Sequence, residues 1–314
     1  MADGSKIEWT DATVNFWWGC TKVGPGCDHC YAEAWAKRIG GGLWGVGAPR
    51  RKIKGAVKLL YRLENGYADW AADQACIVGN AKAFGLPVPT MGPRRRVFIQ
   101  SMSDLFDTEV PVEWFGEAWD HIERCNRLEL QIVTKRLTVI EKRLAAIGRT
   151  SWPKHAGLII SVVNQDEADR DIPRLIELKA KLGIPWIGLS MEPLLSCVVM
   201  NYVWLRHLDW VIVGGESGSN ARPIHPDWVR LLRDRCAATE VPFLFKQWGE
   251  WAPSRFGEER RLININPDGS WEPSVGLLTV QQRLMAKVGK KRAGRLLDGV
   301  EHNGFPHVPE RILA

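Results

Sequence analysis

The sequence predicts an α/β fold, a partial parallel β/α barrel of about six to seven strands. Apolar runs rich in Val, Ile and Leu recur along the chain and alternate with helix-like segments. Buried parallel strands have this continuous apolar character, and alternation with helices is typical of βαβ units. The predicted strands lie at 97–106, 128–136, 157–165, 184–195, 208–218 and 241–250, and the predicted helices at 112–125, 138–147, 166–182 and 226–239.

A further strand is predicted just before Cys20, where the apolar run VNFWW (14–18) would deliver the next loop to the end of the sheet. After that loop, AEAWAKRI (32–39) predicts a helix, which the glycines at 40–42 end. These elements place the loop beside the carboxyl ends of the strands, where β/α barrels carry their chemistry.

Two segments depart from this alternation. Residues 40–93 are expected to form a basic insertion of loop and helix, and residues 280–299 predict a basic, helix-like stretch interrupted by glycines. We therefore expect residues 1–250 to form the barrel with its insertion, and residues 251–314 to form a basic C-terminal extension packed on it.

Composition limits the class of protein. The chain has 314 residues and 45% hydrophobic content, enough for one large α/β domain or two small ones. No apolar run reaches the ~18 residues that a membrane span needs, and the first residues lack an apolar targeting segment. We expect a cytoplasmic protein with no membrane partner. The net charge of +6 permits an anionic partner.

The most informative motif is GCTKVGPGCDHCYA (19–32), in which Cys20, Cys27 and Cys30 are spaced C-x6-C-x2-C. A structural zinc site usually has four protein ligands. A 4Fe–4S cluster held by three thiolates leaves one iron without a protein ligand. In radical S-adenosylmethionine (SAM) enzymes that iron chelates SAM, and an electron from the cluster yields a 5′-deoxyadenosyl radical. The motif therefore favours cluster ligation by the three cysteines.

Other uses of these cysteines are weaker alternatives. A zinc knuckle could add His29, but adjacent His29 and Cys30 do not easily bind one ion together. A disulfide framework fits poorly, because the seven cysteines are odd in number and the other four are scattered.

Polar residues follow each predicted strand, and the barrel rule predicts that they share one site. Glu192 and Lys246 are expected to pair across the barrel mouth, and Lys135 with Arg136 could bind a carboxylate or phosphate. Glycines at strand ends allow a ligand to approach the backbone. The candidate catalytic residues are Lys135, Glu192, Glu216 and Lys246; the candidate cofactor-binding residues are Tyr31, Ser101, Ser103, Asp104, Ser161, Asn164, Gly214 and Gly215.

Two basic stretches are candidates for contact with a nucleic-acid backbone. The segment between Glu33 and Glu64 contains many basic residues and no acid, and the segment between Gln281 and Asp298 contains six basic residues. Either stretch could also be an ordinary solvated surface. The candidate contacts are Arg51, Lys52, Lys54, Lys290, Lys291 and Arg292.

With these motifs laid out, the chain resembles the phage-associated three-Cys-motif family, which is itself similar to radical SAM enzymes. The matching segments are IEWTDATVN, GCTKVGPGCDHCYAE, SMSDLF, TKR, SMEPLL, WVIVGGESGSNARP, FKQWG and GKKRAGRLLDG. The resemblance implies a cluster, SAM, a reductase or flavodoxin-type electron donor, and a host-cell cytoplasmic location if the chain is phage-encoded. It also implies modification or isomerisation of a hypermodified, thymidine-derived base in phage DNA.

Two departures limit what the resemblance transfers. The common radical SAM spacing is C-x3-C-x2-C, and Gly214-Gly215-Glu216 comes later than the usual glycine-rich motif. Three alternatives stay open at this point. The chain could be a radical SAM enzyme that acts on RNA or a small molecule, a lyase that repairs photolesions in DNA, or a zinc-stabilised nucleic-acid-binding module.

Overall fold

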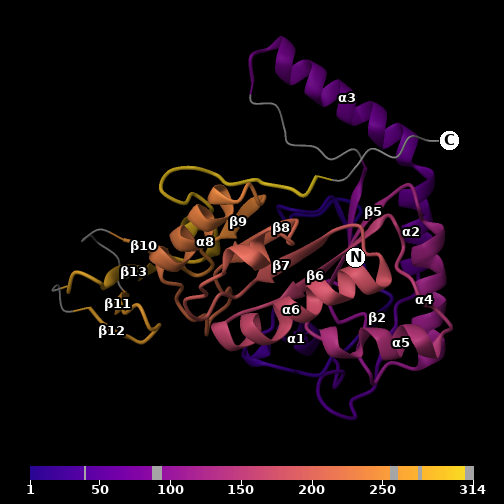
Figure 1. The fold of residues 1–314 in the computed structure, drawn as a ribbon, viewed down its shortest axis with the longest axis horizontal. Helices are drawn as coiled ribbons and strands as arrows, with labels where there is room; N and C mark the ends of the chain where they lie inside the picture. Colours follow the sequence, from indigo (N-terminus) through magenta and orange to yellow (C-terminus); the bar gives the residue numbers. More distant parts are fainter. Residues whose placement is uncertain (39, 87–93, 255–260, 275–277, 308–314) are drawn as a thin grey trace.

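The computed structural model describes residues 1–38, 40–86, 94–254, 261–274 and 278–307. Its centre is a wholly parallel seven-stranded sheet in the order β1-β4-β5-β6-β7-β8-β9, curled into a half-barrel (Figure 1). The predicted fold class is therefore confirmed. The strands are β1 (Ala12–Val14), β4 (Arg96–Ile99), β5 (Glu129–Thr134), β6 (Ala156–Ser161), β7 (Ile187–Met191), β8 (Trp210–Gly214) and β9 (Phe243–Gln247).

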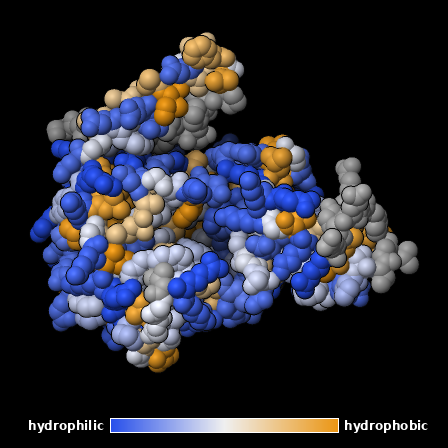
Figure 2. Space-filling view, turned by 180° about the vertical axis from the view of Figure 1, so that it is seen from behind, coloured by the Kyte–Doolittle hydropathy of each residue, from blue (hydrophilic) through white to orange (hydrophobic). Residues whose placement is uncertain are grey.

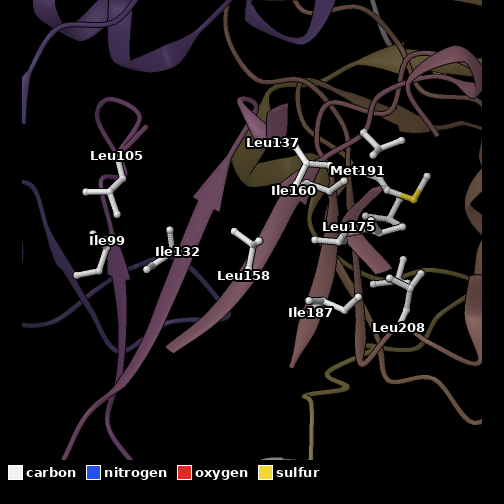
Figure 3. Packing of buried hydrophobic residues seen from close by; sticks show 14 of the residues in the cluster. Ile99, Leu105, Ile132, Leu137, Leu158, Ile160, Leu175, Ile187, Met191 and Leu208 are labelled. Carbon is white, nitrogen blue, oxygen red and sulfur yellow. The ribbon is translucent and has the colours of Figure 1, made fainter. Parts of the chain in front are cut away.

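Helices between successive strands pack against the outer face of this sheet. Alternate strand residues such as Ile132, Leu158 and Ile187 are fully buried and meet helix residues such as Leu175 (Figure 3). The connecting helices are α4 (Val112–Arg124), η2 (Leu137–Val139), α5 (Ile140–Ala146), α6 (Gln165–Leu182), α7 (Tyr202–Leu205) and α8 (Pro226–Ala238). The four helices predicted between strands are thus present, with boundaries shifted by a few residues.

The inner face of the half-barrel is filled by aromatic side chains. Trp9 packs on Phe98 with ring centroids 4.8 Å apart, and Trp186 and Trp210 meet edge to face at 6.0 Å. Gly157 makes room for this packing, because a Cβ added there would lie 2.0 Å from Trp186 Cε2. The lower part of the barrel is therefore a packed core, and open space remains towards the carboxyl ends of the strands.

The run before Cys20 divides between two sheets. Val14, the first residue of this run, is the last residue of β1. Trp17 and Trp18 form β2 (Trp17–Trp18), which pairs antiparallel with β3 (Arg51–Lys52). The loop that follows contains η1 (Pro25–Cys27) and leads into α1 (Tyr31–Arg38).

The insertion after α1 contributes β3 and two helices, α2 (Ala56–Asn65) and α3 (Tyr67–Ala83). Helix α2 packs Leu60 and Leu63 into the main core, while α3 is mostly exposed and projects from the body (Figures 1 and 2). The end of the predicted insertion, 87–93, lies outside the described residues.

The C-terminal part forms a second, antiparallel sheet of four strands in the order β10-β13-β11-β12. Its strands are β10 (Trp251–Pro253), β11 (Leu262–Ile265), β12 (Trp271–Pro273) and β13 (Arg283–Lys287). This sheet corrects the helix predicted over 280–299, where only the turn α9 (Lys290–Ala293) is helical. Met285 and Ala286 are buried within the sheet, and glycines with positive φ at 289, 294 and 299 prevent a continuous helix. The division of the chain at residue 250 stays a prediction.

Within the described residues, no helix combines the length and apolar character required to cross a bilayer.

Candidate active site

A cavity of about 430 Å³ lies at the carboxyl ends of the parallel strands. Its wall combines the cysteine loop with the ends of β4 to β9 and the turn α9. Most of the predicted site residues line this cavity, namely Cys20, Cys27, Cys30, Tyr31, Ser101, Ser103, Asp104, Lys135, Ser161, Glu192, Gly215, Glu216, Lys246 and Lys290. The sheet thus brings together side chains that lie far apart in sequence.

The three cysteines of the motif are free thiols on one wall of this cavity. The loop between them packs closely on the sheet, since a Cβ added at Gly26 would lie 2.8 Å from Val163 Cγ1. Burial raises the pKa of Cys20 to about 12, although the neighbouring Arg136 guanidinium opposes this shift. Gly26 is therefore required because the loop approaches the segment after β6 closely.

One arginine holds the first cysteine from the end of β5. Arg136 Nη2 donates to Thr21 O at 2.8 Å and lies 3.7 Å from Cys20 Sγ. Arg136 also lies 3.6 Å from Asp107 Oδ1, which is fully buried. Its guanidinium therefore fixes the loop by hydrogen bonds and places positive charge beside a thiol.

A second arginine holds the other end of the loop from the segment after β8. Arg222 Nη1 donates to Asp28 Oδ2 at 3.1 Å, and Nη2 donates to Pro25 O at 2.9 Å. Arg222 also forms a bidentate pair with Glu216. Sequence reasoning missed Arg222, because the ARP segment that contains it gives no indication that it reaches the cysteine loop.

Glu216 accepts hydrogen bonds from Arg222, which holds the cysteine loop. Its Oε2 lies 2.9 Å from His29 Nδ1 and accepts from Arg222 N at 2.8 Å. Burial alone would raise the pKa of Glu216, but hydrogen bonds from Arg222 and His29 outweigh burial and hold the pKa below its ordinary value. Both carboxylate oxygens accept hydrogen bonds, so the contacts of Glu216 are those of a residue that positions the loop.

The predicted pair across the mouth is present. Lys246 Nζ lies 2.7 Å from Glu192 Oε1, and each side chain is 15% exposed. Lys135 Nζ donates to Ser161 Oγ at 2.8 Å, and among the described residues no carboxylate lies within salt-bridge distance of it. Lys135 is therefore a cation that faces the cavity and is available to an anionic ligand.

The residues of the SMSD segment mostly make internal contacts. Asp104 is buried and accepts from Thr134 Oγ1 at 2.8 Å and from Lys135 N at 3.1 Å. Ser103 Oγ donates to Trp17 O at 3.1 Å, and Tyr31 Oη donates to the Ser101 carbonyl. These bonds join β2 and α1 to the segment after β4. Ser101, Ser103 and Tyr31 still line the cavity.

Two predicted cofactor residues do not line the cavity. Asn164 caps α6, with Oδ1 accepting from Glu167 N at 2.9 Å, as Asn commonly does at a helix N-terminus. Gly214 allows close packing, because a Cβ there would lie 2.8 Å from Glu192 Cγ. Gly215 does line the cavity, but a Cβ there would lie 2.0 Å from Trp248 O. Local packing thus accounts for both glycines.

Three buried polar atoms on the cavity wall were not predicted from sequence. Trp9 Nε1, Gln100 Nε2 and Gln247 Oε1 have no hydrogen-bond partner among the described residues. Gln100 Oε1 accepts from Phe16 N at 2.7 Å, so its amide nitrogen is the free group. Buried polar groups are nearly always hydrogen-bonded, so these three unpaired atoms are exceptions among the residues that line the cavity.

The predicted basic contacts separate into different environments. Lys290 lines the cavity, and Lys291 and Arg292 are exposed beside it on α9. Lys52 is paired with Glu117, whereas Arg51 and Lys54 are exposed. Only Lys290 among the six candidates is therefore part of the cavity wall.

The three thiols of the motif border one volume, as the ligands of an iron–sulfur cluster must. Among the described residues, no three His, Cys, Asp or Glu side chains converge as a shared metal ion requires. In a 4Fe–4S cluster each thiolate binds a different iron, so three thiols must border a common volume without meeting at one point. Cys20, Cys27 and Cys30 border one cavity in this way.

Two solved structures resemble the backbone of this chain. Spore photoproduct lyase complexed with dinucleoside spore photoproduct is 14% identical, with a TM-score of 0.39, over 82% of this chain and 69% of that chain. A double mutant of spore photoproduct lyase with bound AdoMet and dinucleoside spore photoproduct is 13% identical, with a TM-score of 0.38 and the same coverage.

No curated protein sequence matches the chain. One protein family, described as "Protein of unknown function (DUF5131)", matches residues 4–306, which is nearly the whole length. The chain therefore belongs to this DUF5131 family.

Proposed function

We propose that the protein is a radical SAM enzyme that modifies or isomerises a nucleobase, with a thymidine-derived base in phage DNA as the preferred substrate. The observation that carries the proposal is the placement of three thiols on the wall of a cavity at the carboxyl ends of parallel strands, with no fourth among the described residues that line it. Cys20, Cys27 and Cys30 would hold a 4Fe–4S cluster. With SAM, such a cluster supplies a 5′-deoxyadenosyl radical.

The chain's own residues would bind and orient the other components. Lys135, held by Ser161, would bind an anionic group such as the SAM carboxylate. The Glu192–Lys246 pair would hold a proton on Lys246 Nζ elsewhere on the cavity wall. Trp9 and Phe98 give the cavity an apolar floor that excludes water.

DNA is proposed as the partner because exposed basic residues lie at the mouth. Lys290 borders the cavity, and Lys291 and Arg292 follow it on α9. Cations placed at a mouth attract a phosphate backbone in a salt-dependent way. The electron donor would be a reductase or flavodoxin-type protein.

The test is metal analysis of anaerobically purified protein, with Cys27→Ala as the variant and Cys76→Ala as the matched control, because Cys76 is an exposed thiol on α3. We expect about four irons and four sulfides per chain in the parent and in the control, and loss of both in Cys27→Ala. Zinc without iron and sulfide would contradict the cluster and indicate a zinc-stabilised binding module.

The substrate class is tested separately, by SAM cleavage with reduced protein and candidate substrates. Turnover of modified-thymidine DNA would support the proposal. Turnover restricted to RNA or to a small molecule, or reversal of an irradiated thymine dimer, would replace the proposed substrate and leave the cluster assignment intact.

A further inference from the structure

Helix α1 exposes its two aromatic side chains and buries two of its three alanines. Ala32 and Ala36 are 3% and 1% exposed, whereas Tyr31 and Trp35 are 55% and 39% exposed. Tyr31 and Trp35 are four residues apart, so they are neighbours on one face of the helix and form an exposed aromatic surface. Because Tyr31 also lines the cavity, this surface begins at the mouth of the candidate active site.

The surface continues onto the small sheet beside α1. Trp18 on β2 stacks on Trp35, with ring centroids 4.6 Å apart and planes inclined by 16°. Trp18 is directly opposite Arg51 in the β2–β3 register. Opposite residues of an antiparallel pair project from the same face, so Arg51 lies beside the stacked tryptophans. We call Tyr31, Trp35, Trp18 and Arg51 the aromatic strip.

Arg51 differs from its neighbour Lys52 in what it contacts. Lys52 is paired with Glu117 and lies 5.1 Å from the ring centroid of Trp114, so its charge is used within the protein. Arg51 is exposed, and no carboxylate within the described ranges lies at salt-bridge distance from it. Arg51, which has no carboxylate partner among the described residues, is therefore the cation that lies beside the aromatic side chains.

The cavity wall includes one residue of this strip and one cation of α9. Tyr31 and Lys290 both line the cavity. Single-stranded nucleic acids are commonly bound by aromatic side chains that stack on bases, together with cations that contact phosphates. A strand that crosses the mouth would meet both kinds of contact on its way into and out of the cavity.

We infer that the aromatic strip binds unpaired nucleotides that flank the base in the cavity, so that the enzyme takes its target as single-stranded or locally opened DNA. Bases in a duplex are stacked on each other and cannot present a face to Trp35. A cavity of about 430 Å³ is also too small to admit a duplex. The inference rests on the proposed function for its substrate class, and adds the strandedness of that substrate and the residues that select it.

The test measures binding of a short fluorescein-labelled oligodeoxynucleotide, single-stranded or duplex, to the anaerobically purified protein by fluorescence anisotropy. We expect tighter binding to the single strand. Trp35→Ala should weaken that binding by about 5- to 100-fold, the loss expected for one base–aromatic stack. Trp35→Phe, which keeps an aromatic face, should retain most of the affinity.

The matched control is Trp271→Ala, since Trp271 is 45% exposed but lies on β12, away from the cavity lining. We expect its affinity to equal that of the parent. Arg51→Ala should reduce the slope of log K against log salt by about 0.7, as for loss of one phosphate contact to a single strand.

Three outcomes would overturn the inference. The first is an equal loss of DNA affinity in Trp35→Ala and Trp271→Ala. The second is tighter binding of the parent protein to the duplex than to the single strand. The third is an unchanged DNA affinity of Trp35→Ala combined with slower reduction of that variant by flavodoxin. The last outcome would make the strip a docking face for an electron donor. Binding is measured without SAM turnover, so the DNA-affinity comparisons are independent of the cluster analysis that tests the proposed function, whereas the reduction assay requires the cluster.

Discussion

Arg222 and Glu216 form a bidentate ion pair at the end of β8, with Arg222 Nη2 2.6 Å from Glu216 Oε1 and Nε 2.9 Å from Oε2. The same guanidinium reaches the cysteine loop at Pro25 and Asp28. A single side chain therefore connects the last third of the barrel to the loop that carries the proposed cluster ligands.

Removal of this connection should loosen the loop. We expect Arg222→Gln to lower the free energy of unfolding by about 2 kcal/mol, since the Glu216 side chain is only 5% exposed and would lose its charged partner. Iron retention after chelator challenge should fall as well. Chemical denaturation and iron analysis measure the two effects.

The double variant Glu216→Gln with Arg222→Gln is the control for this prediction, because it leaves no buried charge unpaired. It should recover part of the lost stability without recovering iron retention. Full recovery of both would show that Arg222 acts only on fold stability.

Lys135 should contribute to binding of SAM and not to binding of iron. We expect Lys135→Met to weaken SAM binding by roughly 10- to 100-fold, the loss of a hydrogen bond to a charged group. Equilibrium dialysis measures the affinity. Lys142→Met, on the exposed side of α5, is the control and should bind SAM normally. A Lys135→Met protein with parental SAM affinity would contradict the assignment.

Asp298 should link stability to pH in the acid range. Hydrogen bonds from Arg230, assisted by Arg233, lower the pKa of Asp298 to about 2. A lowered folded-state pKa stabilises the fold above the unfolded value near 3.8, and this contribution is lost as pH falls towards 2.

Asp298→Asn tests this linkage while keeping a residue that tolerates the positive φ of 54°. The Asp298 side chain is 39% exposed, so solvent screening reduces the expected loss near neutral pH to about 0.5 kcal/mol. The difference in Tm between parent and variant should shrink as pH is lowered from about 4 towards 2. A Tm difference between parent and variant that grows as the pH falls would contradict the predicted direction of the pH dependence.

Gly157 should be intolerant of any side chain. A Cβ at this position would lie 2.0 Å from Trp186 Cε2, and Trp186 is 2% exposed and packed against Trp210. We expect Gly157→Ala to destabilise the protein by about 3 kcal/mol or to prevent folding.

Gly79→Ala is the matched control, because Gly79 lies within exposed α3 and an added Cβ there meets nothing within 4 Å. It should stabilise the protein slightly, by about 0.5–1 kcal/mol. Denaturant titration of both variants gives the comparison, and equal effects would show that the Trp186 contact does not limit this position.

The parallel sheet was predictable because its strands are buried on both faces, and such strands leave continuous apolar runs in the sequence. The helix predicted over 280–299 was wrong because Leu284, Met285 and Ala286 belong to β13, where hydrogen bonds to β10 and β11 decide the conformation. Local composition cannot indicate partners that lie at distant positions in the chain.

The sequence by itself determined the order of the parallel strands and of the four main helices between them, the three-thiol motif and the polar residues at strand ends, because each depends on spacing within a short segment. Only the tertiary structure decided what those residues contact. Closure of the sheet brings Arg222 to Pro25 and pairs Lys246 with Glu192, and the β2–β3 register sets Arg51 beside Trp18. Such contacts depend on how distant segments pack, and no local pattern encodes that packing.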